Sequence, residues 1–182
     1  MIIAITGRKF SGKDTSVSVI RSIIKDEARI YHLTFAKPIK QASMALFNLT
    51  EQDLNDPIAK EMRLSGQEWS PREIMQKLGT AVRETFGQDF FINHVLSLIN
   101  SITNNDDKII IVSDVRYDRE AQFLKDKGAI VVKIKRDKYE SGTDTHTSES
   151  GIDPKYVDFV IENNGTIEEL KEKWKEFIDM HI

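Results

Sequence analysis

Short runs of apolar, mostly β-branched residues are the feature that most limits how this chain can fold. They span residues 1–6, 30–35, 109–113 and 130–135, with a weaker run at 159–162. The run that begins at residue 109, Ile-Ile-Ile-Val, does not alternate with polar residues, which is typical of a parallel strand covered by helices on both faces. Because helical patterns lie between the runs, the sequence predicts an α/β fold with a parallel sheet.

The composition fits one compact domain and excludes several classes of protein. The chain has 182 residues, 40% of them hydrophobic and 30% charged, with a formal net charge of -3. This balance does not suggest a chain that coats nucleic acid or an anionic membrane. The absence of cysteine excludes disulfides, thiolate zinc sites and cysteine nucleophiles. No apolar stretch approaches the roughly 20 residues that cross a bilayer, so we expect a soluble, intracellular protein without a secretory signal.

Two stretches differ from the strand-and-helix pattern of the rest. Residues from about 38 to 103 look almost wholly helical, so we expect a helical insertion there, with the core formed by 1–37 and 104–182. The polar stretch at about 137–151 has no strong period and is long enough to form a functional flap.

Two helix starts are well marked. Residues 70–73, Ser-Pro-Arg-Glu, supply an N-cap, a proline at the first helical position and a capping-box partner. Near the end of the chain, 163–165 (Asn-Asn-Gly) predict a turn, and Thr166 with Glu169 predicts a second capping box before the last helix.

Residues 7–15, Gly-Arg-Lys-Phe-Ser-Gly-Lys-Asp-Thr, fit the pattern G-x-x-x-x-G-K of a phosphate-binding loop. The loop follows an apolar run directly and opens a helical pattern, which is the context that gives the motif its mechanism. Its glycines let successive backbone N–H groups point into one cavity, and the helix N-terminus adds the positive end of its dipole. We therefore expect the loop to hold nucleotide phosphates, with Lys13 reaching the outer ones.

A magnesium site is expected beside this loop. Asp14 stands where a hydroxyl residue usually ligates Mg²⁺, and a carboxylate is an equally hard ligand. Thr15 is the alternative source of a hydroxyl, and the sequence leaves open which of the two ligates the ion. Asp114 follows the run at 109–113, at the end of a parallel strand where ligands collect, and is a further candidate.

Two cations also follow predicted strands, at the edge of the sheet where Asp114 is expected. Arg116 lies two residues after Asp114 and is a candidate for bidentate binding of a phosphate; the alternative is an ordinary turn with Arg116 paired to Glu120. Lys37 follows the run at 30–35 and is a candidate contact of an acceptor phosphate; the alternative is a solvated surface lysine.

Six segments together resemble the deoxynucleoside monophosphate kinases of tailed bacteriophages, and the resemblance covers nearly the whole chain. In chain order they are GRKFSGKDT, FAKPIK, SPREIMQKLGT, IIIVSDVRYDREA, THTSE and ENNGT. The resemblance implies the nucleoside monophosphate kinase fold, a three-layer α/β/α arrangement with a five-stranded parallel sheet, a helical insertion that binds the monophosphate and a lid at about 137–151. It implies transfer of the γ-phosphoryl of ATP, with Mg²⁺, to a deoxynucleoside 5′-monophosphate in the cytoplasm of a host cell.

The resemblance also implies roles for individual residues. ATP would be bound by Gly7, Arg8, Lys9, Ser11, Gly12, Lys13, Asp14, Thr15 and Arg136. The monophosphate would be bound by Lys37, Arg72, Arg83, Asp114, Arg116 and Glu149. Catalysis would involve Lys13, Asp14, Arg83 and Arg116, and the metal would be held by Asp14, Thr15 and Asp114. Arg72 and Arg83 lie eleven residues apart, about three turns along one helix face, although each could instead be an exposed helix arginine.

Other readings stay open at this level. A Gly-Lys-Asp loop also resembles that of animal phosphomevalonate kinase, so the acceptor could be another small phosphorylated molecule. A nucleotide-dependent switch is the third possibility, but the guanine-reading pattern Asn-Lys-x-Asp is absent. Trp69, Phe86, Phe90 and Phe91 could stack on a base or pack in a core. The sequence does not decide base preference, discrimination against ribose or whether the chain forms a homodimer.

Overall fold

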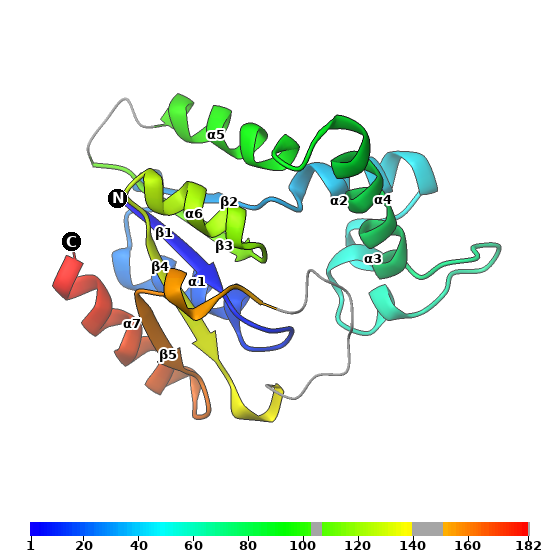
Figure 1. Cartoon of the computed structure of the whole chain (residues 1–182). Coiled ribbons are helices and arrows are strands. Elements are labelled where there is room, and N and C mark those ends of the chain that lie inside the picture. The colour runs from blue at the N-terminus through cyan, green and yellow to red at the C-terminus, as the bar shows by residue number, and fades with distance from the viewer. Residues whose placement is uncertain (103–106, 140–150, 182) are drawn as a thin grey trace. The chain divides into compact units, whose positions relative to one another are not determined.

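A five-stranded, all-parallel sheet forms the centre of the fold in the computed structural model, which describes residues 1–102, 107–139 and 151–181 (Figure 1). The strands are β1 (Ile2–Thr6), β2 (Ile30–Leu33), β3 (Ile109–Val115), β4 (Ile130–Lys135) and β5 (Phe159–Glu162). Their spatial order is β2-β3-β1-β4-β5, so β1 is the central strand. The five predicted strands and the α/β class are confirmed, although β2 ends at Leu33 rather than at residue 35.

Seven α-helices lie in the described part of the chain. They are α1 (Lys13–Ile24), α2 (Lys37–Phe47), α3 (Glu51–Asn55), α4 (Pro71–Phe86), α5 (Phe90–Ile102), α6 (Asp118–Asp126) and α7 (Ile167–His181). Among these described residues, no helix is long and apolar enough to span a bilayer.

The chain divides into two compact units. Unit 1 consists of Met1–Thr34 and Val95–Ile182, and unit 2 consists of Phe35–His94. The helical insertion expected at 38–103 overlaps unit 2, but the division falls inside α5. Val95 and Ile99 of this helix are buried and belong to unit 1, whereas its first residues belong to unit 2.

Unit 1 has helices on both faces of its sheet (Figure 1). On one face, the side chains of Ile3 and Ile5 pack in a cluster with residues of α1 and α7, among them the fully buried Trp174. The alternate residues Ile2 and Ala4 are equally buried, because successive side chains of a strand point to opposite faces and this strand is covered on both. This explains why the apolar runs do not alternate.

Unit 2 has a smaller core of its own. Leu49, Leu54 and Ile74 are buried there, with partly buried apolar side chains around them. The predicted start of α4 is confirmed: Ser70 Oγ accepts a hydrogen bond from the backbone N–H of Glu73 (3.3 Å), and the Ser70 N–H donates to Glu73 Oε2 (2.8 Å). The capping box therefore fixes the helix that carries Arg72 and Arg83.

Candidate active site

The carboxyl ends of the parallel strands bring several polar segments of unit 1 to one edge of the sheet. The phosphate loop follows β1, and the pairing of Thr6 with Val115 places Asp114, the residue before Val115, beside the start of that loop. Arg136 follows β4, and Asn163 follows β5. In open parallel sheets ligands bind at this edge, so the candidate donor site lies where the α/β fold predicts it.

The phosphate loop is tightly curled. Gly7 and Gly12 have φ values of 146° and 104°, which favour glycine. A Cβ on Gly7 would also collide with the carbonyl oxygen of Ile134, on the neighbouring strand β4. Phe10 has φ 63°, a left-handed conformation that for a non-glycine residue costs roughly 1–3 kcal/mol. Glycines thus stand where the chain must curl against β4, and the surrounding fold holds Phe10 in a strained conformation.

Lys13 lies at the first position of α1 with its ammonium group folded back over the loop. Its Nζ donates to the carbonyl oxygens of Gly7 (2.6 Å) and Arg8 (2.8 Å). Gly12 is the N-cap residue of α1. It has no side chain, so it provides no side-chain acceptor for the N–H groups at the start of the helix. The loop therefore combines a cation with helix N–H donors, which together favour an anionic phosphate.

The candidate metal ligands fit a magnesium ion held partly by a substrate. Asp14 is exposed and Thr15 is half-buried, both in the first turn of α1. Asp114 is half-buried near the end of β3, and this end is fixed by a hydrogen bond between Ser113 Oγ and His32 Nε2 of β2 (2.6 Å). Among the described residues there is no cluster of three or more acidic, histidine or cysteine side chains that could cage a metal. Mg²⁺ is usually bound by one or two carboxylates plus substrate phosphates, so these oxygen donors suit it.

The turn after β3 is organised by a buried carboxylate. Glu120 is 3% exposed, and its Oε2 accepts hydrogen bonds from the backbone N–H groups of Arg116 (2.9 Å) and Tyr117 (3.2 Å). From sequence, Glu120 is a possible ion-pair partner of the Arg116 guanidinium. These two hydrogen bonds fix the backbone of the residue from which that guanidinium projects.

Asn163 contacts the phosphate loop, which its position in the sequence does not indicate. Its side chain is 9% exposed and donates from Nδ2 to the carbonyl oxygen of Ser11 in the phosphate loop (2.8 Å). From sequence it reads as part of a turn before the last helix. Its buried contact depends on β5 and β1 belonging to the same sheet, and no local pattern reveals it.

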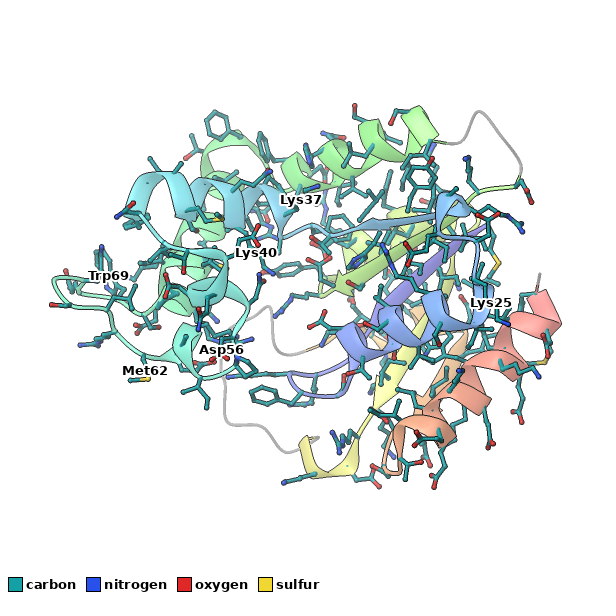
Figure 2. The ribbon with its side chains drawn as sticks, turned by 180° about the vertical axis from the view of Figure 1, so that it is seen from behind. Lys25, Lys37, Lys40, Asp56, Met62 and Trp69 are labelled. Carbon is teal, nitrogen blue, oxygen red and sulfur yellow. The ribbon has the colours of Figure 1, made fainter. Side chains whose placement is uncertain are left out.

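The candidate acceptor residues Lys37, Arg72 and Arg83 belong to unit 2. Lys37 is exposed and lies in the first turn of α2, where Figure 2 labels it. Arg72 Nε forms an ion pair with Glu61 Oε1 (2.7 Å), and the Arg72 side chain is only 12% exposed. The guanidinium of Arg83 lies over the ring of Phe91, 4.8 Å from its centroid. Arg72 and Arg83 are thus held against their neighbours and are not freely solvated.

Two of the four aromatic candidates for base stacking are packed within unit 2. Phe91 is 2% exposed, and Trp69 packs against the small core with Lys77 Nζ 5.0 Å from its ring centroid. Phe86 and Phe90 are 69% and 40% exposed, with their ring centroids 5.6 Å apart. The exposed pair is therefore the better candidate for contact with a ligand. Glu149, with the rest of the expected lid from 140 to 150, lies outside the described residues.

The parallel sheet, the glycine loop and the lysine at the head of α1 define the chain as a P-loop protein of the α/β class. Dephospho-CoA kinase from Campylobacter jejuni has the same fold: its structure matches with a TM-score of 0.54 and 13% identity, over 98% of this chain and 95% of that one. This agrees with the α/β/α arrangement that the resemblance implied.

Sequence comparison identifies the family. The profile of the deoxynucleotide monophosphate kinases matches residues 47–174. A protein of Acanthamoeba polyphaga mimivirus assigned to these kinases is 30% identical over 93% of this chain and 92% of its own length. The deoxynucleotide monophosphate kinase of Enterobacteria phage T4 is 34% identical over 59% of this chain, but that match spans only 45% of the T4 protein.

The chain therefore belongs to the deoxynucleotide monophosphate kinase family. The predicted family and enzyme class are confirmed. Neither the phosphomevalonate-like acceptor nor the nucleotide switch is favoured by this membership.

Proposed function

We propose that this chain transfers the γ-phosphoryl group of ATP to a deoxynucleoside 5′-monophosphate, giving ADP and the diphosphate. The observation that carries the proposal is the Lys13 ammonium group held over a curled glycine loop, at the edge of the sheet where Asp114 also lies. Family membership supports the choice of acceptor. The proposed location is the cytoplasm of a host cell, where both substrates are present.

In the proposed donor site, loop N–H groups and the N-terminus of α1 bind the ATP phosphates. Lys13 lies within reach of the loop carbonyls of Gly7 and Arg8, so exchange of these acceptors for phosphate oxygens requires only a side-chain rotation. Arg136, half-buried directly after β4, is proposed to add a second cation. Charge stabilisation of this kind is the main demand of phosphoryl transfer.

The residues Asp14, Thr15 and Asp114 are proposed to hold Mg²⁺, directly or through water. When bound, the ion would neutralise charge on the β- and γ-phosphates. The task of the protein is then to present hard oxygen ligands beside the loop.

Unit 2 carries the residues proposed to bind the acceptor phosphate, Lys37, Arg72 and Arg83. An oxygen of that phosphate attacks the γ-phosphorus, the bond from the γ-phosphorus to the β–γ bridging oxygen breaks, and ADP leaves. Because the attacking phosphate is already anionic, no general base is required. Arg116, anchored through its backbone by Glu120, is proposed to stabilise charge on the transferring group.

The test is release of ADP from Mg-ATP with each deoxynucleoside and ribonucleoside monophosphate offered separately. A reaction without acceptor measures background hydrolysis, and mevalonate 5-phosphate tests the other kind of acceptor. We expect stimulation by one or more deoxynucleoside monophosphates. Stimulation by mevalonate 5-phosphate alone, or no stimulation in a chain that binds ATP, would contradict the proposal.

A further inference from the structure

We propose that Asn163 is a positioning residue of the donor site, which sets the direction in which the phosphate loop presents its backbone N–H groups. The inference rests on the proposed function in one respect: it takes the loop at residues 7–15 to bind the phosphates of ATP. It adds a residue outside the loop, more than a hundred positions along the chain, on which that binding depends.

The Asn163 carboxamide contacts the backbone of the phosphate loop in a buried position. Nδ2 donates to the carbonyl oxygen of Ser11 at 2.8 Å, and the side chain is 9% exposed. The Asn163 backbone is fixed as well, since its N–H donates to the carbonyl oxygen of Lys135 at 2.7 Å. The donor thus comes from a residue anchored to β4, and its position is independent of the loop.

Holding the Ser11 carbonyl fixes one peptide unit of the loop. In a planar trans peptide the C=O and the following N–H point in opposite directions. With the Ser11 oxygen held by Asn163, the Gly12 N–H points to the opposite side, away from the buried carboxamide. A rotated peptide would instead turn the Ser11 oxygen toward that side, where it would repel phosphate oxygens.

Other features of the loop do not provide this constraint. The hydroxyl of Ser11 is buried and has no hydrogen-bond partner in the described part of the chain. The Ser11 N–H bonds to the carbonyl oxygen of Arg8 at 3.2 Å, which closes the loop but acts on the peptide unit before Ser11 and not on the one that carries the Ser11 carbonyl. The Gly12 carbonyl oxygen accepts from the N–H and the Oγ of Ser16 (2.9 Å each), but these bonds fix the peptide unit after Gly12 and not the one that carries the Ser11 oxygen.

Close packing supports the same role. A Cβ on Gly12 would collide with Nδ2 of Asn163. The loop glycine and the carboxamide therefore fit each other without spare room, and the absence of a side chain at Gly12 allows the donor to reach Ser11.

Two substitutions separate the hydrogen bond from packing. Asn163→Asp keeps the shape but replaces the donor with an oxygen that repels the Ser11 carbonyl, and Asn163→Ala removes the group. Asp158→Ala is the control. Asp158 lies directly before β5, as Asn163 lies directly after it, and its Oδ2 accepts a hydrogen bond from the backbone N–H of Val131 (2.9 Å). All three lose one side-chain to backbone hydrogen bond, and Asp158→Ala also loses an ion pair with Lys125, but only the two Asn163 variants lose a bond at the loop.

The measurements are the Kd of ATP and ADP by calorimetry, the KM of each substrate, kcat and the thermal midpoint. We expect both Asn163 variants to bind ATP and ADP about tenfold more weakly, the effect of losing one well-placed hydrogen bond with its partner left buried. The KM of the monophosphate should stay unchanged, and Asp158→Ala should lower the thermal midpoint without changing the Kd of ATP. A purely structural role would lower the thermal midpoint and leave the Kd of the folded protein alone.

Folded Asn163 variants that bind ATP within about twofold of the wild-type chain would overturn the inference. Failure of the wild-type chain itself to bind ATP would contradict the proposed function instead. The two failures are therefore distinguishable in one set of titrations.

Discussion

The ammonium group of Lys13 lies 2.6 Å from the carbonyl oxygen of Gly7, so the cation of the phosphate loop is held by the residue that begins it. A second bond, to the carbonyl oxygen of Arg8 at 2.8 Å, keeps the side chain over the loop. These two bonds use two of the three N–H donors of the ammonium group. They also keep the positive charge where phosphate oxygens are expected.

Substitution of this lysine should abolish catalysis without unfolding the chain. We expect Lys13→Ala to lower kcat at least about 100-fold, because it removes a charge that stabilises the transferring phosphoryl group. ADP release measures the effect, and circular dichroism checks the fold. Lys175→Ala, at an exposed position of α7, is the control and should retain normal turnover. Substantial activity in a folded Lys13→Ala protein would contradict the assigned role.

Asp14 provides a test of the metal site. We expect Asp14→Ala to lower turnover at least about 100-fold, as loss of a metal ligand beside the phosphates should. The dependence of rate on Mg²⁺ concentration should shift to higher concentrations in Asp14→Asn. Ser18→Ala, one turn further along the exposed side of α1, serves as the control. If folded Asp14→Ala turned over at nearly the normal rate, Thr15 would be the better candidate ligand and Thr15→Ala should then be impaired.

Substitution of the arginines of α4 should weaken binding of the monophosphate without weakening binding of ATP. We expect Arg72→Ala and Arg83→Ala each to raise the KM of the monophosphate about tenfold or more, because each removes charge-assisted hydrogen bonds to phosphate. The KM of ATP should remain unchanged. Arg63→Ala, which removes an exposed arginine of unit 2, is the comparison. Equal effects on both substrates would point to disturbed folding of unit 2 and away from acceptor binding.

The capping box of α4 makes a prediction about stability and pH. Hydrogen bonds from the backbone N–H and then the side chain of Ser70 hold the pKa of Glu73 below its ordinary value. A carboxyl group with a lowered pKa in the folded state adds stability above its unfolded pKa, and this stability is lost as the pH falls through the folded pKa. Urea unfolding should therefore show a loss of stability in acid that is smaller in Glu73→Gln.

The same capping box can be tested at neutral pH. We expect Ser70→Ala to lower the free energy of unfolding by about 1 kcal/mol, the usual effect of losing an N-cap. Thr80→Ala, at an exposed position of the same helix, should change it little. An unchanged unfolding curve for Ser70→Ala would mean that α4 does not depend on its cap.

Local patterns predicted the individual strands and the phosphate loop, because each is marked by a pattern of consecutive residues. The apolar run at 109–112 marks a strand covered on both sides, and the pair of Ser70 and Glu73 marks a helix start. Contacts between distant segments were not predictable in this way. Asn163 reads as a turn residue until β5 is placed two strands away from β1, and Phe91 reads as a candidate stacking residue until its burial is known.

Glu120 illustrates the same limit. Its position four residues after Arg116 is compatible with an ion pair between the two side chains. In the structure its carboxylate accepts from two backbone N–H groups of the turn, a role set by the buried start of α6. Charge spacing does not reveal these backbone contacts, because they depend on the burial of Glu120 and on the direction of the turn's N–H groups.

The central place of β1 also has a consequence for synthesis. The strand is made first, but its partners β3 and β4 begin only at Ile109 and Ile130. At ribosomal rates of about 5–20 residues per second, this apolar segment waits on the order of ten seconds for its first neighbour. During that interval the loop at residues 7–15 has no neighbouring strand to hold it, so we expect the nascent chain to bind nucleotide only after β3 and β4 have emerged. Folding dominated by such distant pairings is slow, and chaperones that cover residues 1–6 would protect the chain while it waits.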